Sequence, residues 1–148
     1  MHKDPFSLFG LPISIFINES VLNERYRAVL KDLHPDQFFG DDAFMKQSAE
    51  QLAAHANHAY QNLRSPLKCA AEAIKAKGWQ VPGADQQTIA DPVLLAEMME
   101  LQEMAKAGED IRPFYQDCLL QFESSLQTNK KEQALAVHAR LSFIARLL

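Results

Sequence analysis

The tripeptide His34-Pro35-Asp36 is the group of residues in this sequence whose chemistry could be used most directly. An imidazole beside a carboxylate could act as a general base with its orienting partner, but catalysis also needs a nucleophile or a pocket. No serine or cysteine lies in the neighbouring sequence, so this interpretation is the weakest of three. In the second, Pro35 and Asp36 simply form a turn. In the third, the tripeptide is a rigid loop that recognises a partner.

Two helical patterns flank the tripeptide and are expected to hold it at the tip of a hairpin. The first helix should run from Asn18 as its cap to Leu33, and the second should start near Asp41-Asp42. Two apolar stripes of matched length joined by a short turn predict an antiparallel pair. The stripe residues are Leu22, Tyr26, Val29 and Leu33 in the first helix, and Met45, Ala49, Leu52, Ala56, Tyr60 and Leu63 in the second.

Two more segments should close this N-terminal core. An aromatic opening segment would press its apolar side chains against the hairpin, and a helix that begins at Ser65-Pro66 and ends at Gly78 would extend the core. We expect Phe38 to anchor the loop. The expected core residues of the two segments are Phe6, Leu8, Phe9, Leu67, Ala70, Ala71 and Ile74.

Composition restricts the class of protein. The chain has 148 residues, of which 47% are hydrophobic and 23% charged, so it can form a globular core. The net charge of −4 argues against a nucleic-acid binder, and no run approaches the ~20 apolar residues that cross a membrane.

The cysteines and histidines predict no disulfide and no metal site. Cys69 and Cys118 lie far apart in the sequence and form no CxxC pair, so neither a disulfide nor a cysteine-built zinc site is expected, which fits a reducing cytoplasm. His55 and His58 could form half of a metal site, but no further ligand lies nearby, so a surface helix is favoured and no metal or cofactor is predicted.

Residues 80–91 have no apolar period and are predicted to be a linker between domains at 1–79 and 92–148. Three helical patterns follow, from Pro92 to about Lys106, from near Asp110, and from Asn129 with Glu132 in a capping-box position. They predict an all-α chain whose second domain is a three-helix bundle. The expected core residues of the bundle are Leu94, Met98, Leu101, Ala105, Ile111, Tyr115, Cys118, Leu119, Phe122, Leu126, Ala134, Val137, Leu141, Ile144 and Leu148.

Several apolar side chains of the bundle fall outside these core stripes. At 100° per residue, Leu95 and Met99 project away from the core of the first bundle helix, beside glutamates. Phe143 lies opposite the core of the last helix, with Leu147 close to it. Single exposed apolar residues are common, so each could be incidental. Together they favour a patch that binds another protein.

The N-terminal half resembles a J domain. The resemblance is carried by Tyr26-Arg27 and Lys31-Asp32-Leu33 before His34-Pro35-Asp36, and by the helix that ends His58-Ala59-Tyr60-Gln61-Asn62-Leu63. J domains bind a DnaK-class chaperone in its ATP state and stimulate its ATP hydrolysis. The resemblance implies that the chaperone-binding residues are His34, Pro35, Asp36, Arg25, Arg27 and Lys31. Many J domains have a lysine or arginine where this chain has Gln37, and the first helix also carries three acids, so we expect weaker and less salt-sensitive docking.

The full chain is similar to the HscB family, the J-proteins of iron–sulfur cluster assembly. The second domain carries this resemblance in the sequence from Asp91-Pro92-Val93-Leu94 to Gln102-Glu103. It implies an L-shaped all-α molecule whose bundle binds an IscU-like scaffold protein and presents it to an HscA-like chaperone. The implied scaffold-binding residues are Leu95, Ala96, Met99, Glu100, Glu103 and Phe143. Ala96 is smaller than the bulky residue expected at its position.

The resemblance implies a co-chaperone that is no enzyme of its own, that carries no cofactor, and that acts as a monomer without binding nucleic acid or membrane. The cluster itself would be held by the scaffold. The alternatives are a general J-protein or helical adaptor with another client, and a hydrolase that depends on His34. Binding of an IscU-like scaffold would separate the HscB-type function from a general J-protein or adaptor. Hydrolysis by the chain in the absence of any chaperone would reveal a hydrolase.

Overall fold

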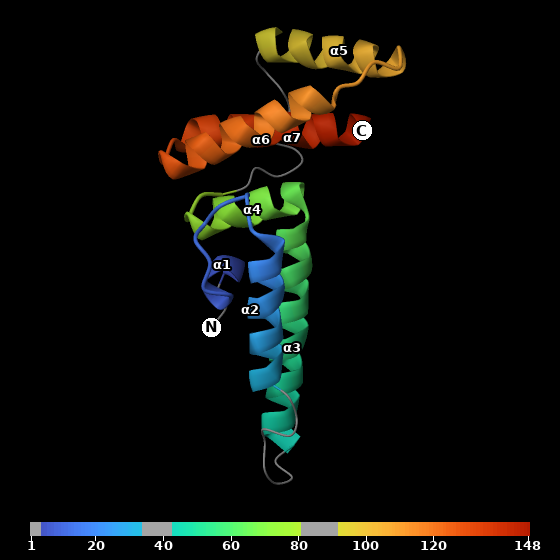
Figure 1. The fold of residues 1–148 in the computed structure, drawn as a ribbon. Helices are drawn as coiled ribbons and strands as arrows, with labels where there is room; N and C mark the ends of the chain where they lie inside the picture. Colours follow the sequence, from blue (N-terminus) through green and yellow to red (C-terminus); the bar gives the residue numbers. More distant parts are fainter. Residues whose placement is uncertain (1–3, 34–42, 81–91) are drawn as a thin grey trace. The chain divides into compact units, whose positions relative to one another are not determined.

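The computed structural model describes residues 4–33, 43–80 and 92–148, and these residues form seven helices and no strand. The predicted all-α class is therefore confirmed (Figure 1). Within the described residues, no helix combines the length and the apolar character needed to span a membrane. The helices are α1 (Pro5–Leu8), α2 (Glu19–Asp32), α3 (Ala43–Arg64), α4 (Pro66–Ala76), α5 (Pro92–Lys106), α6 (Arg112–Gln127) and α7 (Lys131–Leu147).

The chain divides into two compact units, Met1–Glu72 and Ala73–Leu148. Of the predicted linker, Gln80 is exposed and residues 81–91 lie outside the described residues, so the linker stays a prediction. Residues 34–42, which include His34-Pro35-Asp36, Gln37 and Phe38, also lie outside them, as does the predicted start of the second hairpin helix at Asp41-Asp42.

The ends of two helices in the N-terminal half follow from local chemistry, as the sequence predicts. The side chain of Asn18 accepts hydrogen bonds from the amides of Ser20 and Val21 at 2.9 and 3.2 Å, which satisfies two free N–H groups at the start of α2. After α4, Gly78 adopts a φ of +79°, and the Trp79 amide bonds back to the carbonyl of Ile74 at 3.0 Å. That arrangement is a Schellman-type ending, which favours glycine at the left-handed position.

α2 and α3 pack side by side, as predicted (Figure 1). α1 packs on α3. Three of the four buried residues of α3 are alanines, which lets the two long helices approach closely. The buried residues are Ala49, Ala56, Ala59 and Leu63. Two residues of the predicted stripe are instead exposed, Met45 by 45% and Leu52 by 52%. α3 has 22 residues against 14 in α2, and Met45 extends past the end of the shorter helix. Leu52 falls beside the line through Ala49 and Ala56 that faces α2.

The opening segment closes the hairpin as predicted, because Phe6 and Phe9 are 1% and 2% exposed. Leu8 is only partly buried. On α4, Ala70 and Ile74 are buried, whereas Leu67 and Ala71 are partly buried. α1 has four residues, too few to be stable alone, so its place depends on these aromatic side chains.

In the C-terminal unit, α6 and α7 lie side by side (Figure 1). α5 packs against α7. Most of the predicted core is buried, and Leu94, Ala105 and Tyr115 are partly buried. Leu148 was predicted in the core but is 59% exposed, because it follows the last residue of α7. The core residues that are confirmed as buried are Met98, Leu101, Ile111, Cys118, Leu119, Phe122, Leu126, Ala134, Val137, Leu141 and Ile144.

The predicted capping box at Asn129 is wrong. Asn129 has a φ of +55°, a left-handed conformation that ends α6, and the amide of Lys130 bonds back to the carbonyl of Ser125 at 2.9 Å. α7 starts at Lys131, and its N-cap residue Lys130 makes no side-chain cap bond. The Asn129 side chain instead accepts a hydrogen bond from the Lys77 ammonium at 2.8 Å. Asparagine is favoured at both kinds of position, and here the helix-ending role prevails.

Candidate protein-docking surfaces

The exposed side of α2 carries the described part of the predicted chaperone-binding site. Arg27 and Lys31 are both exposed and lie one turn apart on one face of the helix. Glu24 is also exposed and lies on the same face, one turn before Arg27. Arg25 projects from a different side of α2, so the structure does not bring all three predicted cations together.

Arg25 faces α1. Its guanidinium Nη1 donates hydrogen bonds to the carbonyl oxygens of Phe9 at 3.2 Å and Gly10 at 3.5 Å. These carbonyls lie at the end of α1, where a helix leaves acceptors unsatisfied and where a cation is favoured. Although the Arg25 side chain is exposed, its charged group thus bonds to the backbone of its own unit.

A polar seam of reciprocal tyrosine–asparagine bonds joins α2 to α3. The Tyr26 hydroxyl donates to Asn57 Oδ1 at 3.1 Å, and the Tyr60 hydroxyl donates to Asn23 Oδ1. The two rings stack between these bonds, with centroids 4.1 Å apart and planes within 8°. The sequence analysis missed this seam, although the pattern Asn-x-x-Tyr occurs once in each helix. In an antiparallel pair, that repeat places each asparagine opposite the other helix's tyrosine.

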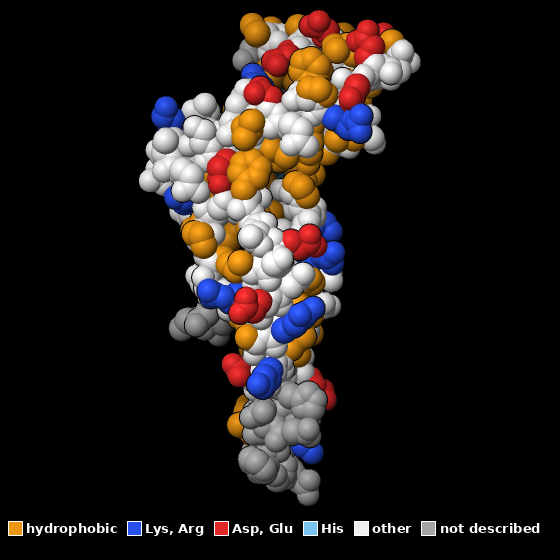
Figure 2. All heavy atoms as spheres, in the orientation of Figure 1, with side chains coloured by type: hydrophobic (Ala, Val, Ile, Leu, Met, Phe, Trp, Pro, Cys, Tyr) orange, Lys and Arg blue, Asp and Glu red, His pale blue; other side chains and the backbone are white. Residues whose placement is uncertain are grey.

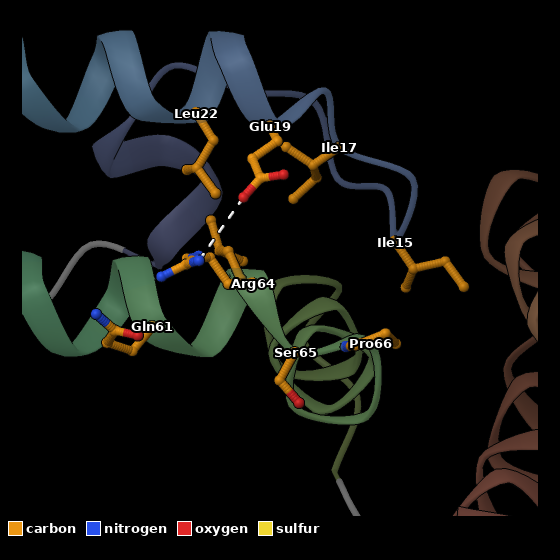
Figure 3. A pocket seen from close by; sticks show the side chains of 9 residues that line it. Ile15, Ile17, Glu19, Leu22, Gln61, Arg64, Ser65 and Pro66 are labelled. Carbon is orange, nitrogen blue, oxygen red and sulfur yellow. Dashed lines mark ion pairs between the residues drawn. The ribbon is translucent and has the colours of Figure 1, made fainter.

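The seam continues into an open hollow of about 480 Å³ near the start of α2 and the end of α3 (Figure 3). Glu19 and Arg64 point toward each other there, with Oε1 and Nη2 3.7 Å apart. The remaining lining is mostly apolar and contains no histidine or cysteine. Among the described lining residues, Glu19 and Arg64 are the only charged side chains and they pair with each other, so these residues offer no catalytic set. The lining residues are Ile15, Ile17, Glu19, Leu22, Gln61, Leu63, Arg64, Ser65 and Pro66.

α5 carries the predicted scaffold-binding residues on its outward side. Leu95 is 47% exposed and Met99 59% exposed, so both lie outside the core. Ala96, Glu100 and Glu103 are exposed as well. Figure 2 shows hydrophobic and acidic side chains mixed over α5, at the top of the view. A partly apolar, partly acidic surface of this kind is typical of protein docking.

Phe143 of α7 is only partly buried, as its position opposite the core stripe predicts. One turn before it, Arg140 Nη2 lies 3.5 Å from Glu97 Oε2 of α5. Glu97 and Glu100 lie on neighbouring positions of the α5 surface. The ion pair therefore connects the side of α7 that carries Phe143 to the side of α5 that carries these two glutamates. Leu147 follows one turn later on the same side and is also partly buried.

The titratable groups that the structure describes in the C-terminal unit assemble no reactive site. His138 is 5% exposed, its ring lies 6.5 Å from that of Phe122, and burial lowers its pKa. The sequence analysis missed this histidine, which lies next to the core residue Val137. Cys118 is buried, and burial raises the pKa of its thiol while Arg140 lowers it to a smaller extent. Cys69 is also buried, and both cysteines are free.

Among the residues that the structure describes, no three histidine, cysteine, aspartate or glutamate side chains gather closely enough to hold a metal ion. His55 is partly buried and His58 exposed on α3, and the His58 ring nitrogen Nε2 lies 3.4 Å from the Asn62 amide nitrogen. Asn62 in turn donates to Glu72 at 3.2 Å. These polar groups connect α3 to α4.

Known proteins resemble the chain over nearly its full length. A protein of Cupriavidus taiwanensis named co-chaperone protein HscB homolog is 37% identical over 142 residues, which are 95% of this chain and 78% of that protein. The structure of chaperone HscB from Vibrio cholerae matches with a TM-score of 0.79 at 33% identity, over 97% of this chain and 92% of the other. The crystal structure of human co-chaperone protein HscB matches with a TM-score of 0.81 over 98% of this chain and 78% of the other, and at 22% identity it supports the fold. No family model matches the chain.

Proposed function

Because this chain belongs to the HscB co-chaperone family, we propose that it stimulates ATP hydrolysis by a DnaK-class, HscA-like chaperone. We further propose that it delivers an IscU-type scaffold protein to that chaperone during iron–sulfur cluster assembly and transfer. The main structural support is that two compact units each expose a surface that their own cores do not use. One surface is cationic, on α2, and the other is apolar and acidic, on α5.

The N-terminal surface is proposed to dock on the chaperone. His34, Pro35 and Asp36 would reach the ATPase, and Arg27 and Lys31 would attract its acidic surface. Attraction between exposed charges acts mainly on the rate of encounter and decreases as salt increases. The chain itself is proposed to hydrolyse nothing and to carry no cofactor. Its two buried, free cysteines suit a reducing compartment such as the cytoplasm.

The C-terminal surface is proposed to bind the scaffold. Leu95 and Met99 would enter apolar pockets of the partner, where methionine adapts well to an irregular surface. Ala96 is a small neighbour of Met99 on the helix surface, and Glu100 and Glu103 would form a polar rim that prefers basic groups. Phe143 would contribute from α7, on the side that the Arg140–Glu97 ion pair connects to α5.

Two variants separate these activities when ATP hydrolysis by an HscA-like chaperone is measured with and without an IscU-type scaffold. His34→Gln should abolish stimulation and leave scaffold binding intact. Leu95→Ala/Met99→Ala/Phe143→Ala should weaken scaffold binding by at least about tenfold, because each truncation removes apolar contact area, while stimulation without scaffold is retained.

The matched controls are Lys68→Gln, an exposed cation of α4, and Leu120→Ala, a 61% exposed apolar residue of α6. Both should behave as the unmodified chain does. Because Phe143 is partly buried, Leu95→Ala/Met99→Ala serves as a second variant that leaves α7 untouched. Stimulation of DnaK-class chaperones without any affinity for the scaffold would instead indicate a general J-protein. ATP hydrolysis by the chain alone that is lost in His34→Gln would indicate an enzyme.

A further inference from the structure

The contact between Arg25 and α1 gives this arginine a role different from that of the other cations of α2. α1 has four residues and ends at Leu8, and the carbonyls of its C-cap residue Phe9 and of Gly10 follow directly. The Arg25 guanidinium lies across this end and donates to both carbonyls, at 3.2 and 3.5 Å. Hydrogen bonds from a charged donor are stronger than neutral ones, so this contact is well suited to hold a short helix in place.

The backbone at Gly10 supports this interpretation independently. Gly10 adopts a φ of +63°, which side chains on an L-residue disfavour. A Cβ built at this position would lie 2.8 Å from Arg25 Nη1, closer than real Cβ contacts. A side chain at position 10 would therefore push the tip of the Arg25 guanidinium aside and would also strain the backbone at this φ.

The contact also connects α1 to the polar seam between the long helices. The Phe9 ring meets the Tyr26 ring edge-on, with centroids 6.2 Å apart, and Tyr26 is the neighbour of Arg25 on α2. Tyr26 then stacks on Tyr60 of α3. One end of α1, the middle of α2 and α3 are thus linked through consecutive contacts.

We propose that Arg25 is a positioning residue, which fixes the end of α1 against α2 and does not itself dock on the chaperone. Arg27 and Lys31, on the other side of α2, are the cations that meet the chaperone. The first half of the proposal, the fixing of α1 by Arg25, can be measured on the isolated full-length chain. The second half, that Arg27 and Lys31 and not Arg25 meet the chaperone, rests on the proposed function.

Amide hydrogen exchange of the full chain tests the first half. The amides of Leu8, Phe9 and Leu11 bond within α1 and its end, at 3.0, 3.2 and 2.8 Å. Arg25→Gln should make these amides exchange about tenfold faster, since it removes a charged donor from two carbonyls. The exposed control Arg27→Gln should leave them unchanged. Unchanged exchange in Arg25→Gln, or equal acceleration in Arg27→Gln, would overturn the proposal.

Gly10→Ala provides a variant that disturbs the same contact without changing charge. It should also accelerate exchange of these amides. The double variant Gly10→Ala/Arg25→Gln should do so by less than the product of the two single factors, because both changes break one contact. If the acceleration of exchange in the double variant equals the product of the two single factors, Arg25 and Gly10 act separately, which would contradict the proposed contact.

The salt dependence of chaperone stimulation tests the second half. Arg25→Gln should shift the half-maximal concentration by no more than about threefold and keep the salt slope of the unmodified chain, whereas Arg27→Gln should flatten that slope. Arg25→Lys keeps the charge and should give intermediate amide exchange with an unchanged slope. If Arg25→Gln and Arg27→Gln flatten the salt dependence of stimulation equally, Arg25 is itself a docking cation and the proposal is overturned. If the unmodified chain stimulates no chaperone, the proposed function fails, while the exchange experiment still decides the role of Arg25.

Discussion

Glu24 lies on the exposed face of α2 that also carries Arg27 and Lys31, and it partly cancels their charge. We predict that Glu24→Gln strengthens docking on the chaperone by about two- to fivefold at low salt, because it removes a like charge from the path of an acidic partner. The salt dependence of the affinity should become steeper. The comparison variant Glu50→Gln, also exposed but on α3, should change neither quantity. Titration of the chaperone across a salt series measures both.

His138 makes the stability of the C-terminal unit depend on pH. Burial lowers its pKa in the folded chain, so below the ordinary histidine pKa the unfolded chain binds a proton that the folded chain does not. Stability should therefore be unaffected by this group above about pH 6.5. It should decrease toward lower pH, by at most ~1.4 kcal/mol per pH unit, until the folded pKa is reached.

The His138 prediction is measured by urea unfolding of the full chain between pH 7.5 and 5.5, with α6 and α7 followed by hydrogen exchange. His138→Gln should flatten the decrease, since glutamine does not titrate. His58→Gln, at an exposed histidine of α3, is the matched control and should keep it. An undiminished slope in His138→Gln would refute the assignment.

At the scale of elements, the tyrosine seam sets how α2 and α3 align. Tyr60→Phe removes the bond to Asn23 but keeps the ring stacked on Tyr26, so we predict a loss of about 0.5–1.5 kcal/mol in unfolding free energy. Tyr60→Leu also removes the stack and the contact with the Arg64 guanidinium, which lies 5.3 Å from the ring centroid, and should cost more. Urea unfolding, followed by the exchange of α2 and α3 amides, gives the order of the two variants. Equal losses would mean that the stack contributes nothing.

The elements were predictable wherever one local rule decides them. Asn18 as the cap of α2, Pro66 at the start of α4 and Gly78 at its end each follow from backbone chemistry that involves only neighbouring residues. Asn129 was mispredicted because two local rules compete for asparagine, and the end of α6 decides between them. Met45 was mispredicted because periodicity shows which side of a helix is apolar and cannot show where the partner helix ends.

In the candidate surfaces, too, the features set by local helix geometry were predictable, and those set by distant contacts were not. Periodicity correctly placed Leu95 and Met99 outside the core, because a helix in a bundle buries only one stripe. The resemblance to J domains grouped Arg25 with Arg27 and Lys31, and this grouping stays a prediction, although Arg25 projects from a different side of α2. The contact of Arg25 with Gly10 spans 15 residues of chain, and no local pattern predicts it.

For the whole molecule, the proposed function requires both surfaces on one chain. We predict that a mixture of His34→Gln chains and Leu95→Ala/Met99→Ala/Phe143→Ala chains does not restore the extra stimulation that scaffold gives with the unmodified chain. Each variant keeps one activity, but only a chain with both raises the local concentration of scaffold at the chaperone. The measurement is ATP hydrolysis at protein concentrations below the scaffold affinity. Full recovery in the mixture would show that the two activities need no physical link.

The burial of both cysteines has a consequence for work beside a metal cluster. A thiolate within reach of iron could extract it or become a bridging ligand, and Cys69 and Cys118 are only 1% and 7% exposed. The raised pKa of Cys118 also keeps its sulfur protonated near neutral pH. In the proposed complex with a scaffold protein, this burial would keep both thiols from competing for the iron of the cluster.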